Sequence, residues 1–139
     1  MINFIAEDIL FPDINQHDIT TWIKQTAGFY LKKIGNICYI FCSDERMLEV
    51  NKQYLQHDYY TDIITFDYSQ GNKIAGDIFI SLDTVKSNSE EQKTTYEEEL
   101  LRIIIHGILH LCGQNDKNTA DKMEMTRKEN LALSQFLNG

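Results

Sequence analysis

One strongly apolar segment near the end of the chain most constrains its fold. From about Thr94 to Cys112 the sequence predicts a long helix, with three glutamates near its start and Gly113 as its stop signal. Leucine and isoleucine dominate the second half, so this helix is expected to be buried against other elements. The same half carries His106 and His110, and buried imidazole groups need polar partners.

The rest of the chain predicts an α+β fold, in which a mixed sheet of about four strands has helices packed on it. Asn15 and Ser43 are expected N-caps, and the turn at 69–72 predicts a hairpin between the last two strands. Residues 87–95 are polar and are expected to form a surface loop. The expected strands are Ile2–Ile5, Asn36–Cys42, Ile63–Phe66 and Lys73–Ser81; the other expected helices are about Asn15–Leu31, one from Ser43 to about Leu55, a short Leu82–Asn88 and Thr119–Leu137.

Length and composition favour a single domain over residues 1–139. Hydrophobic residues make up 42% and charged residues 24%, which is ordinary globular usage. No run approaches the ~18 apolar residues of a membrane span. Residues 1–10 lack the basic region of a signal peptide, so a cytoplasmic protein is expected.

The three cysteines do not indicate a disulfide scaffold, because their number is odd and no C-x-x-C pair occurs. Cys38 and Cys42 lie in an apolar run and are expected to be small buried residues of a strand. Cys112 lies near the histidine pair, as buried filler or as a residue that supports the pair.

The histidine pair has the spacing of a metal site. His106 and His110 are four residues apart, which places both imidazoles on one helix face, and Asp116 lies just past the helix stop. Imidazole and carboxylate together suit zinc at ~2.0–2.2 Å per bond, and three protein ligands leave one position for water. The metal would lower the pKa of that water towards ~7. The alternative is that both histidines are satisfied residues of the core.

Gly107 stands where the common zinc-protease motif has its glutamate base. The general base must therefore come from elsewhere or be the metal hydroxide itself. A glycine within a helix costs about 1 kcal/mol relative to alanine, so we expect a close approach to the backbone there. His17 and His57 are expected to be surface residues.

Two sequence blocks resemble the YbeY family of bacterial metal-dependent rRNA maturation endoribonucleases. The family pattern H-G-x-L-H-L-x-G-Y-D-H is similar to residues 106–116, which read HGILHLCGQND. The family pattern L-N-x-x-Y-R-x-x-D-x-P-T-D-V-L-S-F is similar to residues 50–66, VNKQYLQHDYYTDIITF, and G-D-I follows at 76–78. The resemblance covers most of the chain.

The resemblance implies a zinc-dependent, single-strand endoribonuclease that acts in ribosomal RNA maturation and ribosome quality control. Its metal ligands would be His106, His110 and Asp116, and Thr61 and Asp62 would line the cleft. Nickel or another divalent metal would also suit these ligands. The implied partners are ribosomal RNA, or the small ribosomal subunit and its proteins, with no membrane and no DNA.

Three departures from the family pattern bear on how RNA would be held. Asp116 replaces a histidine ligand, which adds a negative charge and makes the metal a weaker Lewis acid. Leu55 replaces an arginine, the natural group for binding phosphate. Gln114 and Asn115 replace a tyrosine and an aspartate. The phosphate must then be bound by another cation, and Lys117 is the nearest in sequence.

Two other functions stay open at this point. One is a metal-dependent hydrolase of another substrate, such as a peptide or a small ester. The other is a ribosome-associated binding module with a vestigial metal site, because the formal net charge of −8 disfavours direct contact with nucleic acid.

Overall fold

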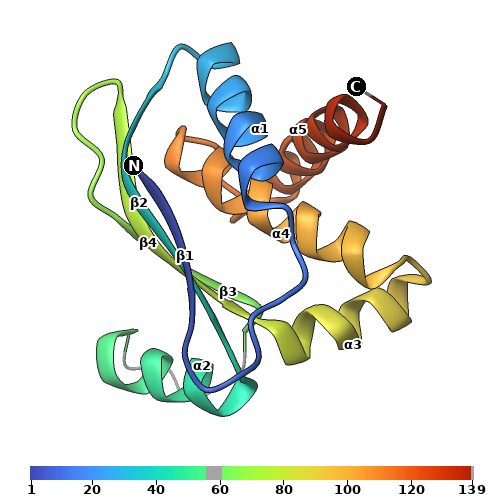
Figure 1. Cartoon of the computed structure of the whole chain (residues 1–139). Helices are drawn as coiled ribbons and strands as arrows, with labels where there is room; N and C mark the ends of the chain where they lie inside the picture. Colours follow the sequence, from blue (N-terminus) through green and yellow to red (C-terminus); the bar gives the residue numbers. More distant parts are fainter. Residues whose placement is uncertain (56–60, 139) are drawn as a thin grey trace.

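A computed structural model describes residues 1–55 and 61–138 of the chain, and it contains one four-stranded mixed sheet (Figure 1). The strand order is β1-β2-β4-β3, where β1, β2 and β4 are parallel and β3 runs antiparallel to β4. The predicted α+β class, the four strands and the hairpin are confirmed. The strands are β1 Ile2–Ala6, β2 Lys33–Cys42, β3 Ile63–Asp67 and β4 Lys73–Ser81.

Five α-helices accompany the sheet over the described residues. Asn15 and Ser43 cap the first two as predicted, since their side chains accept from Asp18 N at 3.0 Å and from Arg46 N at 3.2 Å. The helices are α1 Gln16–Phe29, α2 Asp44–Val50 with a π-helical turn at Asn51–Leu55, α3 Leu82–Gln92, α4 Tyr96–Leu111 and α5 Thr119–Asn138.

The expected loop at 87–95 is wrong, because α3 continues through Gln92 and leaves only a short connection to α4. Val85 and Ser89 lie one turn apart on the buried side of this helix. The remaining residues of the segment are polar because they face solvent. Lys93 then ends the helix in the left-handed conformation, with a φ of 58°.

The two faces of the sheet carry unequal cores. Helices α1 and α4 cover one face, and α5 packs on α4 outside it (Figure 1). Alternate residues of β2 and β4 point into this main core, among them Tyr39, Phe41 and Ile78. A smaller cluster on the other face joins Met47 of α2 to Ile64 of β3.

Helix α4 lies closest to the sheet at Gly107. A Cβ atom added there would lie 3.0 Å from Ile78 Cδ1 and 3.4 Å from Ile63 Cδ1. The expected close approach to this glycine is confirmed. It holds the face of α4 that carries the histidines against the beginning of β3.

Two buried polar groups tie the helices into this arrangement. The hydroxyl of Tyr39 on β2 donates to Ile104 O of α4 at 2.7 Å. The indole of Trp22 on α1 donates to Ala132 O of α5 at 2.9 Å. The positions of α4 on the sheet and of α5 against α1 are therefore set by specific contacts as well as by apolar burial.

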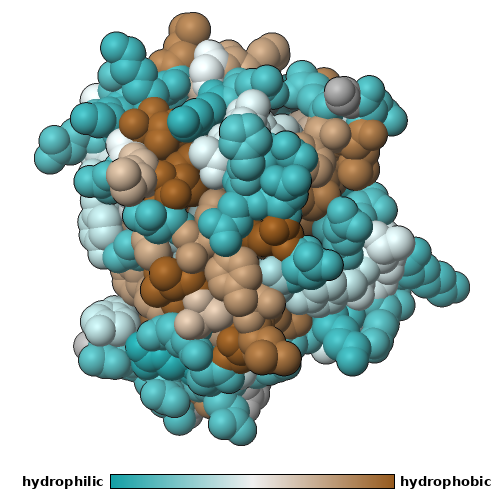
Figure 2. All heavy atoms as spheres, viewed as in Figure 1, coloured by the Kyte–Doolittle hydropathy of each residue, from teal (hydrophilic) through white to brown (hydrophobic). Residues whose placement is uncertain are grey.

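The face of the molecule seen in Figure 2 carries apolar side chains in several places. Figure 2 shows apolar side chains gathered along β1 and the segment that follows it, and the exposed large residues there include Ile5, Leu10 and Phe11. None of the described helices is long and apolar enough to cross a membrane.

Candidate active site

A cavity of about 400 Å³ lies where α4 passes the beginning of β3. The loop after α4 contributes Asp116, and α5 contributes Glu129. Four residues expected at the site from the sequence lie in this cavity, and three further polar residues join them. The polar lining is Thr61, Asp62, Glu99, Arg102, His106, Asp116 and Glu129.

His106 lies between two carboxylates. Its Nδ1 is 2.6 Å from Glu129 Oε2, and its Nε2 is 3.3 Å from Asp116 Oδ2. An ionised carboxylate only accepts hydrogen bonds, so the short contact with Glu129 requires a proton on Nδ1. In the neutral ring this leaves the lone pair of Nε2 directed towards Asp116. A carboxylate behind a histidine is the usual support of a metal-binding imidazole.

The separation of His106 Nε2 and Asp116 Oδ2 suits a shared zinc ion. Two donors at ~2.0–2.2 Å from one tetrahedral ion lie about 3.3–3.6 Å apart. The observed 3.3 Å falls within that interval. The donor chemistry and spacing of these two groups therefore fit zinc.

His110 lies one turn beyond His106 on α4 and is half-buried, but it does not line this cavity. Over residues 1–55 and 61–138, no three His, Cys, Asp or Glu side chains are gathered as a metal-binding group. The structure thus brings His106 and Asp116 together without His110. The role of His110 as the third ligand stays a prediction.

Burial and charge together shift the pKa of three groups of the cavity. Burial lowers the pKa of His106, but the hydrogen bond and charge of Glu129, with the charge of Asp116, outweigh this and raise it. Burial raises the pKa of Asp62, opposed by His106. Burial also raises the pKa of Glu99, opposed by Arg102.

Sequence reasoning missed the network behind His106. Arg102 Nη1 donates to Glu129 Oε1 at 2.9 Å, and Arg102 Nη2 donates to Asn130 Oδ1 at 2.8 Å. The sequence positions of both charged residues give an indication of this network. Arg102 precedes His106 by one helical turn, and Glu129 lies in the apolar stripe of α5 between Met125 and Leu133.

Apart from Asp116, the residues named above as departures from the family pattern, and the lysine expected to replace the missing arginine, lie outside the cavity lining. Lys117 is exposed and does not line the cavity. Leu55 is 40% exposed, and Gln114 Nε2 donates to Asn115 O at 2.9 Å within the loop that carries Asp116. His57 falls outside the described residues. 

The cysteines and the remaining histidine take structural or surface positions. Both Cys38 and Cys42 lie in β2 as predicted; Cys42 is buried, whereas Cys38 is only half-buried. Cys112 packs against the main core, where burial raises its pKa to about 11 despite the charges of Lys32 and Lys128. This supports its interpretation as filler. His17 is exposed, as predicted.

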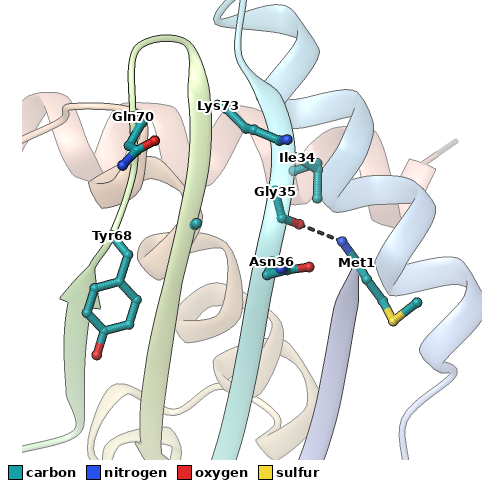
Figure 3. Close-up of a pocket in the computed structure, with 8 residues that line it drawn as sticks. Met1, Ile34, Gly35, Asn36, Tyr68, Gln70 and Lys73 are labelled. Atoms are coloured by element: carbon teal, nitrogen blue, oxygen red, sulfur yellow. Dashed lines mark hydrogen bonds between the residues drawn. The ribbon is translucent and has the colours of Figure 1, made fainter.

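A second cavity, of about 280 Å³, lies at the hairpin end of the sheet, away from Asp62 (Figure 3). The amino group of Met1 donates to Gly35 O at 2.6 Å beside it. Tyr68 and Lys73 also line it, and none of the described residues in its lining is a histidine or carries a carboxylate. Its lining therefore lacks the groups expected of a hydrolytic site.

The fold and the main cavity define a small α+β protein with a histidine–carboxylate site. The sequence profile of the family described as Endoribonuclease YbeY matches residues 5–137, and the chain belongs to this family. The Endoribonuclease YbeY of Bacteroides fragilis is 62% identical over 133 residues, which cover 96% of each chain. That of Porphyromonas gingivalis is 48% identical and aligns with 95% of this chain and 87% of its own.

A solved structure shows the same fold. The solution structure of a Thermotoga maritima protein superposes with a TM-score of 0.71 and covers 99% of this chain and 90% of its own. Its sequence identity is 24%, so this likeness bears on the fold alone.

Proposed function

We propose that this protein is a metal-dependent endoribonuclease that cleaves single-stranded RNA in ribosomal RNA maturation and ribosome quality control. Family membership and relatives named Endoribonuclease YbeY support a nuclease role. The observation that carries the metal-dependent part is the position of His106 Nε2 opposite Asp116 Oδ2, with Glu129 behind the ring.

The proposed ligands are His106, His110 and Asp116, with zinc as the metal and nickel or another divalent ion as substitutes. When bound, zinc would supply a Lewis acid and a water of lowered pKa. Glu129 would hold the His106 ring with Nδ1 protonated, so that Nε2 is free to act as a ligand. His110, one turn along α4, is the proposed third ligand.

Two carboxyl groups of the cavity are suited to move a proton. Asp62 and Glu99 both have raised pKa values, and groups that titrate closer to neutral pH are better acid–base catalysts. Asp62 lies at the entrance to β3, and Thr61 beside it forms the rim. Asp62 is thus proposed to accept or return a proton during cleavage.

The ribosomal part of the proposal has its own requirements. A chain with a net charge of −8 would approach the small subunit most readily through cationic ribosomal proteins. The proposed place of action is the cytoplasm. Cells depleted of the protein should accumulate unprocessed ribosomal RNA precursors. Wild-type protein should restore processing, and the His106→Ala variant should not.

Cleavage of a labelled single-stranded RNA by zinc-loaded protein tests the enzymatic core of the proposal. His106→Ala and His110→Ala should each lose cleavage, because each removes one proposed ligand. His17→Ala is the matched control, since His17 is an exposed histidine on α1. Equal cleavage by His110→Ala and wild type would show that a contaminating nuclease is at work and would overturn the assignment.

A further inference from the structure

Any enzyme that cleaves RNA in this cavity must accommodate the negative charge of the phosphates. Carboxylates dominate the cavity, where Asp62, Glu99, Asp116 and Glu129 all line the wall. Among the described residues that line it, Arg102 is the one lysine or arginine. The usual arginine of the family is Leu55 in this chain. Beside the proposed metal ion and His106, Arg102 is therefore the fixed positive charge among the described residues of the cavity wall.

Arg102 is held in place but is not saturated. One Nη1–H bonds to Glu129 and one Nη2–H bonds to Asn130, at 2.9 and 2.8 Å. A guanidinium has five N–H donors, so three remain for another acceptor. The Arg102 side chain is 27% exposed, and such a partly fixed, accessible fork is suited to binding a phosphate.

Arg102 also faces a second hollow. A groove of about 570 Å³ between α3, α4 and α5 is lined by Arg102, Glu99 and Glu129 from the cavity side. Glu91 and four neutral polar residues line the rest, namely Asn88, Gln92, Thr94 and Thr126. An RNA strand that leaves the cavity towards this groove would pass over the Arg102 guanidinium.

We propose that Arg102 binds a backbone phosphate of the RNA next to the one that reacts, in place of the arginine that Leu55 replaces. This inference rests on the proposed function, because it assumes that RNA enters the cavity beside His106. Glu129 and Asn130 orient the guanidinium from behind. The remaining N–H groups face the RNA strand where it passes from the cavity to the groove.

The competing interpretation is that Arg102 only ties α4 to α5 through Glu129 and Asn130. Substitution alone does not separate the two, because Arg102→Gln also removes a partner of the buried Glu129 carboxylate. Arg102→Lys keeps the positive charge but loses the planar set of N–H donors of the guanidinium. Arg127→Gln is the matched control, since Arg127 pairs with Glu124 on the exposed side of α5 and does not line either hollow.

Steady-state cleavage of single-stranded RNA at several salt concentrations measures the phosphate contact. For Arg102→Gln we expect KM to rise about 10- to 100-fold, as for loss of one charge-assisted hydrogen bond. The magnitude of the slope of log affinity against log salt should fall by about 0.7, the value for one phosphate on a single strand. Arg102→Lys should be intermediate, and Arg127→Gln should match wild type.

A series of RNAs, each with one neutral methylphosphonate linkage, separates the loss of a phosphate contact from structural damage caused by the Arg102 substitution. At the linkage that Arg102 contacts, wild type and Arg102→Gln should show the same KM, because there is no charge left to bind. At other linkages the full difference should persist. A difference that persists at every linkage, or an unchanged KM and salt slope for Arg102→Gln, would overturn the role of Arg102. Absence of binding and cleavage by wild type would instead overturn the proposed function itself.

Discussion

The Glu129 carboxylate lies 2.6 Å from His106 Nδ1, across the interface between α4 and α5. Glu129 is only 6% exposed, although glutamate is rarely buried without a partner. Its second oxygen accepts from Arg102, so both ends of the carboxylate are engaged. This pairing orients His106, whose other ring nitrogen faces Asp116.

Replacement of Glu129 by glutamine should weaken zinc binding. The amide oxygen can accept a hydrogen bond from Nδ1–H, but it lacks the charge that strengthens the imidazole as a ligand, so we expect a loss of about 10- to 100-fold in zinc affinity. Isothermal titration with zinc measures this. Glu124→Gln, at an exposed site of the same helix, is the control. Unchanged zinc affinity in Glu129→Gln would contradict a supporting role for Glu129.

Asp62→Asn should stabilise the protein at neutral pH. The folded pKa of Asp62 is raised above the unfolded value, so the folded state holds this proton more tightly. The stability that protonation provides is present below the unfolded pKa and is lost as pH rises through the folded pKa. At pH 7 the buried charge therefore destabilises the fold. The charged groups that share the cavity with it are Glu99, Arg102, His106, Asp116 and Glu129.

Urea unfolding at several pH values checks this prediction. The advantage of Asp62→Asn over wild type should be largest near neutral pH and should shrink as pH falls towards 4. Asp13→Asn, on the exposed segment before α1, is the control for a general effect of charge removal. An advantage of Asp62→Asn that does not change with pH would show that burial of the charge is not its cause.

Gly107→Ala should lower the free energy of unfolding. Its Cβ would lie 3.0 Å from Ile78 Cδ1, closer than an ordinary van der Waals contact, and Ile78 is fully buried. Overpacking of this kind costs about 1–3 kcal/mol, against a gain of roughly 1 kcal/mol from helix propensity. Gly28→Ala in α1 is the matched control, because nothing lies within 4 Å of its added Cβ. If both variants gain stability alike, the contact between the added Cβ at position 107 and Ile78 does not destabilise the fold.

Much of the fold was predictable because local patterns encode it. The alternating apolar residues of β4 gave the strand bounds Lys73–Ser81 that the structure has. The tail of α3 was not predicted, since polar residues on a solvent-facing side resemble those of a loop. One buried residue per turn, at Val85 and Ser89, was too weak a signal.

From local spacing, the candidate site was likewise predictable only where its residues are close in the sequence. The spacing of His106 and Asp116 within one helix and its stop made their meeting predictable. Glu129 is 23 residues from His106 and reaches it only because α5 packs back on α4. Such packing depends on contacts between distant elements, among them the Trp22–Ala132 hydrogen bond. Local spacing carries no information on that docking, so the sequence alone points to Lys117 as the cation, whereas the folded chain places Arg102 in the cavity wall.

Elemental analysis of protein purified without an affinity tag tests the central claim most directly. The metal site predicts about one zinc or other divalent ion per chain in wild type and in His17→Ala. It predicts almost none in His106→Ala or Asp116→Ala. Wild-type protein that carries no metal, and that stays empty after zinc is added, would contradict the metal site.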